Sequence, residues 1–196
     1  MITSSQLVLK RAFDFLLSLL LLPLLILPIF IFVLIASIDS RQFGVFTQTR
    51  VGQHGRLFSI YKIRTLKNEV HHLGHLEKSA TPFGRFLRRS KLDELPQVFN
   101  VLKGDMSFVG PRPDVPGFAD QLEGDDRIIL RVKPGITGPA TLKYADEDVL
   151  LSSQADPEQY NRTIIWPDKL LINKKYVQSW SFSLDLWLIL KSIFTT

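Results

Sequence analysis

The chain has 196 residues, enough for one domain or for one domain and a membrane anchor. It contains no cysteine, which excludes a disulfide framework, a thiolate metal site and a cysteine nucleophile. Its net charge of +5 is unevenly placed, because residues 40–92 hold eleven Lys or Arg and only two acidic residues. A basic segment attracts nucleic acid, anionic lipid or a phosphorylated substrate. Since this one adjoins an apolar segment, we expect lipid and substrate and no nucleic acid.

An uncharged, almost wholly apolar segment runs from residue 15 to residue 38. As a helix it would measure about 36 Å, which is enough to cross the hydrocarbon core of a bilayer. It is too long for a cleaved signal peptide, and no small-residue cleavage pattern follows it. Pro23 and Pro28 lie inside it, and each removes a backbone hydrogen bond and bends a helix.

Positive charge flanks this segment on both sides, with Lys10 and Arg11 before it and Arg41 after it. The positive-inside rule places both flanks in the cytoplasm, which a simple spanning helix does not achieve. We therefore predict a re-entrant helical hairpin over residues 1–39 that bends at its two prolines. A spanning helix is the alternative.

Short segments with β character follow the anchor. Residues 45–48 and 57–65 are predicted strands joined by a turn over residues 51–55, which makes a β-hairpin. Lys62 and Arg64 have the same parity on the second strand, so both side chains could point at one ligand. The alternative is a pair of solvated strand charges.

Two adjacent carboxylates, Asp93 and Glu94, open an apolar run with helical spacing that ends at Gly104. With Asp93 as the N-cap, Pro96 falls in the first turn, where its missing N–H costs little, and this is the register that we predict. Both carboxylates would then lie at the positive end of a helix, which also attracts anions.

Cations surround the carboxylate pair. Upstream, a short predicted helix with Thr81 as its N-cap and Pro82 at its first position leads into a basic cluster. Downstream, Arg112 stands between two prolines, whose φ angles are fixed. Carboxylates, arginines and a helix N-terminus this close together indicate phosphate chemistry, and a capped helix beside a solvated basic segment is the alternative. The basic cluster comprises Arg85, Arg88, Arg89 and Lys91.

The segments around this pair resemble the signature of the bacterial sugar transferases, the monotopic phosphoglycosyl transferases. Asp14, together with Lys10 and Arg11 one turn before it, resembles the family's entry motif, in which the carboxylate can pair with either cation. One departure is the bend, because leucine precedes both prolines where family members often have serine. The matching segments are residues 92–97 (LDELPQ), 99–107 (FNVLKGDMS), 109–113 (VGPRP), positions within 46–65, and 132–138 (VKPGITG).

This resemblance implies transfer of a sugar-1-phosphate from a UDP-sugar to polyprenyl (undecaprenyl) phosphate, with release of UMP, as the first membrane step of a bacterial surface glycan pathway. It implies that Asp93 is the nucleophile, through an aspartyl-phosphosugar intermediate, and that Glu94 assists in acid–base or metal-ordering work. It also implies Mg²⁺ at Asp93, and Glu94 is a possible second ligand. The substrate- and phosphate-binding residues would be Arg112, Arg88, Lys62, Arg64, Pro111, Pro113, Gly135 and Thr137, and the lipid-headgroup residues Lys10 and Arg11.

The predicted fold is α+β and mostly helical: a monotopic membrane protein with a small β-hairpin and interfacial amphipathic helices. Residues 1–39 are the anchor, and residues 40–196 are a catalytic domain on the cytoplasmic face of the bacterial inner membrane. A homo-oligomer is possible. Near the C-terminus, apolar residues that include Trp180 and Trp187 are interrupted by Asp185. We expect an interfacial helix with tryptophans at headgroup depth, and core packing is the alternative.

Two polar clusters have the composition of metal sites. His71, His72 and His75 lie in a predicted loop without a fourth ligand, which disfavours a zinc site. Residues 146–148 are acidic and are expected to be solvated.

Two further expectations concern the second half of the chain. Residues 114–130 are helix-prone, and Pro157 and Pro167 are expected to break any long helix.

Two other function classes compete with a transferase. A glycosidase needs carboxylates on both sides of the scissile bond, about 5–9.5 Å apart, which neighbouring residues do not supply. A non-catalytic basic scaffold on the membrane surface would explain the anchor and the charge. It would not explain Asp93 and Glu94 beside the Pro-Arg-Pro segment.

Overall fold

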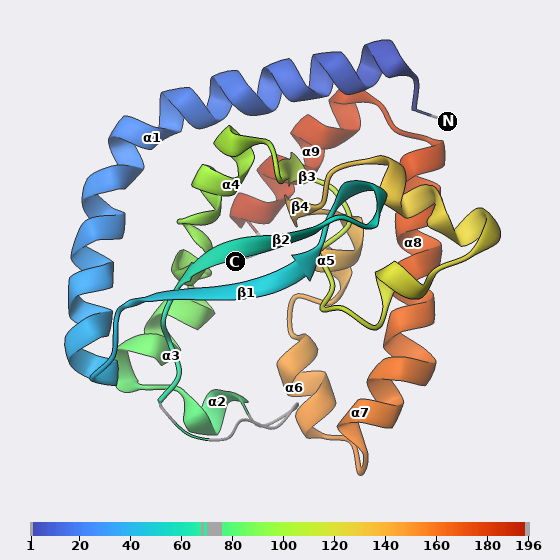
Figure 1. Cartoon of the computed structure of the whole chain (residues 1–196). Helices are drawn as coiled ribbons and strands as arrows, with labels where there is room; N and C mark the ends of the chain where they lie inside the picture. The colour runs from blue at the N-terminus through green and yellow to red at the C-terminus, as the bar shows by residue number, and fades with distance from the viewer. Residues whose placement is uncertain (1, 68, 70–75, 195–196) are drawn as a thin grey trace.

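The computed structural model of the chain describes residues 2–67, 69 and 76–194. Its longest element, α1 (Ser4–Ser40), begins with a capping box in which Thr3 and Gln6 each satisfy the other's backbone N–H. α1 runs across one edge of the molecule, bends, and continues down the adjacent side (Figure 1). Pro23 and Pro28 lie inside α1 and account for a bend, because neither has an N–H for the helical ladder. The predicted re-entrant hairpin is not shown as such, since α1 is one bent helix.

The burial pattern of α1 is the reverse of that of a helix in water. Its buried residues in the first half are polar, namely Lys10, Asp14 and Ser18, which are spaced four apart on one face. Its outer face is apolar, its mean hydropathy reaches 3.2 over 18 residues, and only 11% of that window is buried. By length and composition α1 is able to cross a membrane, and its outer face suits contact with lipid. The exposed apolar side chains include Leu16, Leu20, Leu24, Leu27, Phe30, Leu34 and Ile38.

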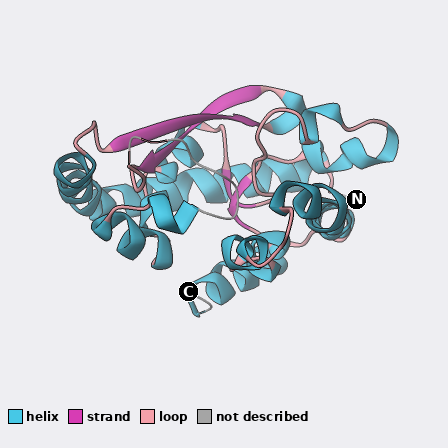
Figure 2. Ribbon diagram, turned by 90° about the horizontal axis from the view of Figure 1, so that it is seen from below, coloured by secondary structure: helices cyan, strands magenta, loops and turns pink. Residues whose placement is uncertain are grey.

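The predicted β-hairpin is confirmed. β1 (Val45–Val51) and β2 (Leu57–Ile63) are antiparallel, and a 3-10 turn at Gln53–Gly55 joins them. Gly55 adopts a φ of 80°, a left-handed conformation that glycine reaches without strain. Seen from below, the hairpin lies along one side of the molecule and most helices lie on the other (Figure 2).

Two short helices follow, α2 (Leu76–Ser79) and α3 (Pro82–Arg89). As predicted, the Thr81 hydroxyl caps α3 by accepting from the Gly84 N–H, and Pro82 occupies the first helical position.

The carboxylate pair lies in a 3-10 turn, η2 (Leu92–Glu94), ahead of α4 (Gln97–Lys103). The predicted register, with Asp93 as the N-cap of a helix, is wrong: Lys91 is the N-cap of η2, and α4 begins only after Pro96, which is its own N-cap. The Leu95 N–H donates to the Leu92 carbonyl, which closes a tight 3-10 turn and sets the carboxylate pair apart from α4. α4 ends as predicted at Gly104, whose φ is 97°.

A two-stranded parallel sheet follows α4. It consists of β3 (Ser107–Val109) and β4 (Gly135–Thr137). The predicted helical segment at 114–130 is instead irregular backbone with two 3-10 segments, η3 (Ala119–Gln121) and η4 (Gly124–Arg131). After β4 come α5 (Pro139–Lys143) and α6 (Glu147–Ser152).

Pro167 does not break the next helix, contrary to prediction. α7 (Pro157–Tyr160), a π-turn η5 (Asn161–Ile165) and α8 (Trp166–Gln178) follow without a gap. The Trp166 N–H bonds to the Asn161 carbonyl five residues back. A wider turn of this kind shifts the backbone pairing and tolerates the missing N–H of Pro167.

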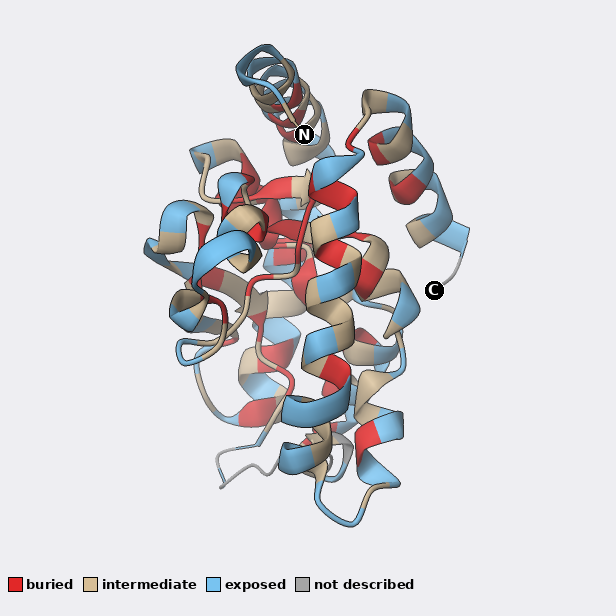
Figure 3. Ribbon diagram, turned by 90° about the vertical axis from the view of Figure 1, so that its right-hand side faces the viewer, coloured by how far each residue is buried: buried red, intermediate tan, exposed pale blue. Residues whose placement is uncertain are grey.

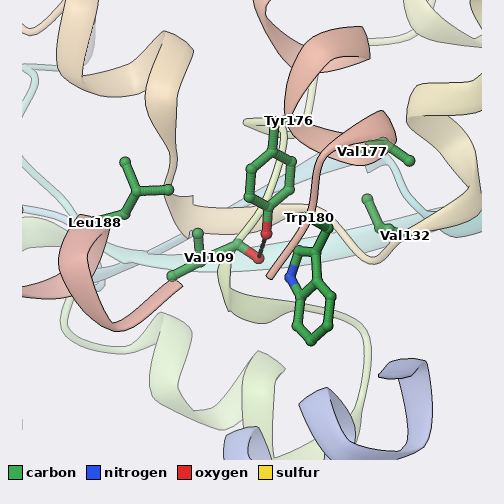
Figure 4. Close-up of a cluster of buried hydrophobic side chains, with 6 residues drawn as sticks. All are labelled: Val109, Val132, Tyr176, Val177, Trp180 and Leu188. Atoms are coloured by element: carbon green, nitrogen blue, oxygen red, sulfur yellow. Dashed lines mark hydrogen bonds between the residues drawn. The ribbon is translucent and has the colours of Figure 1, made fainter. Parts of the chain in front are cut away.

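The last helix, α9 (Phe182–Phe194), packs beside β3 and β4. Trp180 is buried rather than at headgroup depth, whereas Trp187 and Phe194 are exposed on α9. Figure 3 shows α9 and the N-terminal arm of α1 at the same end of the molecule. The interfacial position of α9 stays a prediction. The core cluster around Trp180 (Figure 4) contains Val109, Val132, Tyr176, Val177, Trp180 and Leu188.

Candidate active site

Glu94 is the centre of a buried ion-pair network. Its Oε1 accepts from Lys62 Nζ at 2.7 Å and from Arg112 Nη2 at 2.6 Å. Burial by itself raises the pKa of Glu94, but the charges of Arg112 and Lys62 outweigh burial and hold this pKa well below its usual range. The charge of Glu94 in turn raises the pKa of Arg112. At neutral pH, Glu94 is therefore a fixed anion that holds two cations together.

Asp93 lies beside this network and is only 6% exposed. Among the residues that the structure describes, none donates a hydrogen bond to its carboxylate or forms an ion pair with it. Burial raises the pKa of Asp93, the Lys62 charge lowers it and the Glu94 charge raises it, and the net shift is upward. A desolvated carboxylate that accepts no hydrogen bond from the described residues loses little hydration and few hydrogen bonds when it attacks an electrophile.

A strained turn places both carboxylates. Lys91 adopts a left-handed conformation, with φ 56°, between the end of α3 and η2. For a residue with a side chain this costs on the order of 1 kcal/mol. The sharp change of direction lays η2 against β2, the strand that supplies Lys62.

The β3–β4 sheet fixes the backbone that leads to Arg112. The Gly110 N–H donates to the Thr137 carbonyl, and the Gly135 N–H donates to the Pro111 carbonyl. A Cβ on Gly135 would lie 2.1 Å from the Gly110 nitrogen, so this position requires glycine. Arg112 then extends from between its two prolines toward Glu94. The arrangement is a nucleophile candidate beside two cations held by a neighbouring carboxylate, which suits phosphoryl transfer.

Comparison with known proteins agrees with this chemistry. A family model described as bacterial sugar transferase matches residues 5–196. The chain belongs to the bacterial sugar transferase family. It is 34% identical over 183 residues to a Bacillus subtilis protein described as the uncharacterized sugar transferase EpsL, which covers 92% of this chain and 83% of that protein.

Two longer relatives are also 34% identical to this sugar transferase. They are the undecaprenyl-phosphate glucose phosphotransferase of Komagataeibacter xylinus and the UDP-glucose:undecaprenyl-phosphate glucose-1-phosphate transferase of Escherichia coli. Each match covers 95% of this chain but only 35% and 40% of the respective relative. The resemblance read from the sequence is thereby confirmed at the level of the family.

The sugar transferase holds two of the predicted phosphate-binding arginines away from Glu94. Arg88 pairs with Asp148 in α6, although its charge still acts on Asp93. Arg64 follows the last residue of β2, and its guanidinium lies over the Phe46 ring, 5.6 Å from the ring centroid. Its Nε donates to the Phe43 carbonyl at 2.9 Å, so the expected convergence of Lys62 and Arg64 on one ligand is not found.

The acidic residues 146–148 are not simply solvated, contrary to prediction. Asp148 pairs with Arg88, and Glu147 accepts from Lys169 Nζ at 2.5 Å. No local pattern indicates these partners, because they lie on other helices.

Lys10 and Arg11 both have partners inside the protein, and their role at a lipid headgroup stays a prediction. Lys10 is buried and donates to Asp185 at 2.5 Å, while Arg11 donates to the Val101 and Leu102 carbonyls at the end of α4. The expected pairing of Asp14 with either cation is wrong, because Asp14 accepts from residues of β3. These contacts tie the first part of α1 to the body of the sugar transferase.

Thr137 and Gly135 both have structural contacts in the sheet, and their role in binding phosphate stays a prediction. The Thr137 hydroxyl lies 2.5 Å from the Ser192 hydroxyl of α9. Together with the close approach at Gly135, this contact holds β4 between β3 and α9.

Two residues near Arg112 were not predicted as site residues. Arg50 on β1 donates to the Pro113 carbonyl at 3.2 Å, and burial together with the Arg112 charge lowers its pKa to about 10. Burial raises the pKa of Asp114 to about 7, although the Lys169 and Arg50 charges lower it. The position of Arg50 within the matching block of residues 46–65 is the one signal that could have indicated it.

Asp93 is the described residue best suited to bind Mg²⁺. Among residues 2–67, 69 and 76–194, no group of three or more His, Asp or Glu gathers around one point. Mg²⁺ is commonly held by one or two carboxylates together with substrate phosphates. The Asp93 carboxylate has no ion-pair partner in the part of the chain that the structure describes, and it fits that pattern. Glu94 fits it less well because its charge is already shared by two cations. His71, His72 and His75 lie outside the described residues.

Proposed function

We propose that this chain transfers a sugar-1-phosphate from a UDP-sugar to polyprenyl phosphate through a covalent intermediate on Asp93. The observation that carries the proposal is the buried Asp93 carboxylate, which no described residue pairs with, directly beside Glu94, which is ion-paired to Lys62 and Arg112. The names of the relatives, which are undecaprenyl-phosphate sugar phosphotransferases, support the two substrate classes. A first membrane step in a bacterial surface glycan pathway is the corresponding cellular role.

The transfer takes place in two displacements at one phosphorus. An Asp93 carboxylate oxygen attacks the phosphorus that bears the sugar, the bond to the bridging oxygen breaks, and UMP leaves with the electron pair. A phosphate oxygen of polyprenyl phosphate then attacks the same phosphorus. Asp93 leaves as a free carboxylate, and the product is polyprenyl-diphosphate-sugar.

Charge is the main obstacle to the first displacement. Two unit negative charges 4 Å apart repel by about 4 kcal/mol at an effective dielectric constant of about 20. The Arg112 side chain remains 40% exposed while it is paired with Glu94, so part of this side chain is accessible to a phosphate oxygen. Glu94 keeps Arg112 and Lys62 in place and leaves Asp93 free. When bound, Mg²⁺ would supply further charge neutralisation at Asp93 and the phosphates.

We further propose that residues 1–39 form a re-entrant anchor and that residues 40–196 lie on the cytoplasmic face of the inner membrane. Both ends of α1 contact the same catalytic body, which supports this topology. Lys10 pairs with Asp185 near the start of α1, and Asp39 at its other end accepts from the Phe83 N–H at 3.1 Å. A straight spanning helix would carry one of these ends to the opposite side of the membrane.

The test is a panel of UDP-sugars offered to the purified full chain with polyprenyl phosphate and Mg²⁺, with UMP as the readout. Release of UMP from one donor, its loss on chelation, and a lipid-linked sugar product are expected. A protein that binds anionic vesicles but releases no UMP from any donor would be a membrane-surface scaffold, and that result would overturn the proposal.

A further inference from the structure

Asp14 is a buried carboxylate of α1 that reaches into the catalytic body. It is 1% exposed, and its Oδ1 accepts from the Ser107 Oγ and from the Phe108 N–H, both at 3.0 Å. Ser107 and Phe108 belong to β3, the strand that leads to Arg112. A residue of the apolar helix thus bonds directly to the strand that precedes the phosphate-binding arginine.

β3 has two edges, and Asp14 completes one of them. On one edge, the Ser107 N–H donates to the Pro134 carbonyl, and just past the end of the strand the Gly110 N–H donates to the Thr137 carbonyl. On the other edge, the Phe108 N–H points to Asp14, which takes the place of a third strand. Without Asp14, the buried Ser107 hydroxyl and the partly buried Phe108 N–H would both lose their acceptor, so this edge depends on the carboxylate.

A second carboxylate holds the same elements together. Asp185 of α9 is 1% exposed and accepts from Lys10 Nζ at 2.5 Å, Tyr176 Oη at 2.7 Å and Trp180 Nε1 at 3.0 Å. The Tyr176 oxygen also lies 3.4 Å from the Val109 carbonyl, as the dashed line in Figure 4 shows. α1 is therefore connected to β3 both directly and through α8 and α9.

We propose that Asp14 is a positioning residue for Arg112. Docking of the membrane helix then determines where the Arg112 side chain meets the donor phosphates. β3 is only three residues long, and Arg112 follows it by three residues. A strand this short has few hydrogen bonds of its own, and loss of its Asp14 edge allows it to shift. Displacement of a phosphate-binding side chain by about 1 Å is enough to slow a reaction roughly a hundredfold. This inference rests on the function proposed above.

The variants separate positioning from stability. Asp14→Ala removes the acceptor, whereas Asp14→Asn keeps an oxygen that accepts the same two bonds. Ser18→Ala is the matched control, because Ser18 is equally buried on the same face of α1 but donates only to the Phe15 carbonyl of its own helix. Ser107→Ala is a milder variant that removes one of the two donors, and it serves if Asp14→Ala does not fold.

The measurement is a double-mutant cycle with Arg112→Lys, read as single-turnover release of UMP by the full chain in lipid nanodiscs. Asp14→Ala is expected to slow release roughly tenfold to a hundredfold when Arg112 is present, and to add little in the Arg112→Lys background. Asp14→Asn and Ser18→Ala should keep rates close to the parent rate. If Arg112→Lys is too slow to time, the same cycle is read from the dissociation constant of UMP in the presence of Mg²⁺.

Equal losses from Asp14→Ala in both backgrounds would show that Asp14 acts on stability alone and would overturn the inference. So would a parent-like rate in Asp14→Ala, or a loss in Asp14→Asn as large as in Asp14→Ala. No release of UMP by the parent with any donor counts against the proposed function instead. The two failures are thus distinguishable.

Discussion

Arg112 and Lys62 donate to the same oxygen of Glu94, although they come from distant parts of the chain. The shared oxygen brings two cations together next to Asp93, which makes no ion pair of its own among the described residues. One carboxylate is thus used to organise positive charge, and its neighbour is left free.

Asp93→Asn should abolish turnover, with a loss of at least about a thousandfold, because it removes the nucleophile but keeps the size of the side chain. The parent, incubated with UDP-sugar alone, should gain the mass of a sugar phosphate on Asp93, and the variant should not. Asp125→Asn, at an exposed position of η4, is the control. A sugar-phosphate adduct mapped to any other residue would contradict the assignment.

The same substitution should stabilise the protein at neutral pH. Because burial raises the pKa of Asp93, its charged form is disfavoured in the folded state. Below the unfolded pKa of about 3.9 both states are protonated and the penalty is absent. As pH rises from there through the raised folded pKa, the parent loses stability relative to Asp93→Asn. Thermal unfolding at pH 4 and pH 7 should show the gain in melting temperature only at the higher pH, and a lower melting temperature for the variant at pH 7 would refute the idea.

Arg112→Lys should lower kcat/KM for the UDP-sugar about tenfold to a hundredfold. Lysine keeps the charge but loses the planar fork that donates to Glu94 and to phosphate at the same time, and a hydrogen bond to a charged group contributes about 1.5–3 kcal/mol. Arg56→Lys, on the exposed end of the hairpin turn, tests the same chemical change away from the site. Full activity in Arg112→Lys would show that this position supplies charge only.

Local signals predicted the local parts of the fold well. The Thr81 cap, the β-hairpin and the end of α4 at Gly104 each depend on a few neighbouring residues, and each is confirmed. The partner of Lys10 is Asp185, which lies 175 residues away, and no local pattern points to it. Sequence reasoning therefore placed Lys10 at a lipid headgroup, where a cation before an apolar segment is usually found.

The site itself was predicted in part for the same reason. Asp93, Glu94 and Arg112 are near in sequence, and resemblance indicated them together. Strand parity suggested Lys62 and Arg64 as a pair, but parity does not reveal their partners. Lys62 pairs with Glu94, whereas Arg64 donates to the Phe43 carbonyl and lies over the Phe46 ring. Pairs such as Arg88 with Asp148 depend on how α6 folds back, which periodicity does not reveal.

Glu94→Gln should reduce turnover by about tenfold or more, because two cations lose the charge that holds them. The effect on stability should depend on pH. The folded pKa of Glu94 is depressed, so its ion pairs stabilise the parent above the unfolded pKa of about 4.3, and this contribution is lost as pH falls toward the folded value. Denaturant unfolding should show a deficit for Glu94→Gln at pH 7 that narrows toward pH 3. A deficit that stays constant across this range would contradict the role assigned to its charge.

The last prediction concerns the topology of α1. Both ends of this helix pack on one body, through Lys10 with Asp185 and through Asp39 with the Phe83 N–H, so both should lie on the cytoplasmic side. Since the chain has no cysteine, single cysteines report the side without background. Ser5→Cys and Phe43→Cys are suitable because both side chains are exposed and Ser5, unlike Thr3, does not cap the helix. In intact cells, an impermeant maleimide should leave both unlabelled until the membrane is opened. Labelling of Ser5→Cys alone in intact cells would instead mean that α1 spans the membrane, and the contact between Lys10 and Asp185 could then not exist in the bilayer.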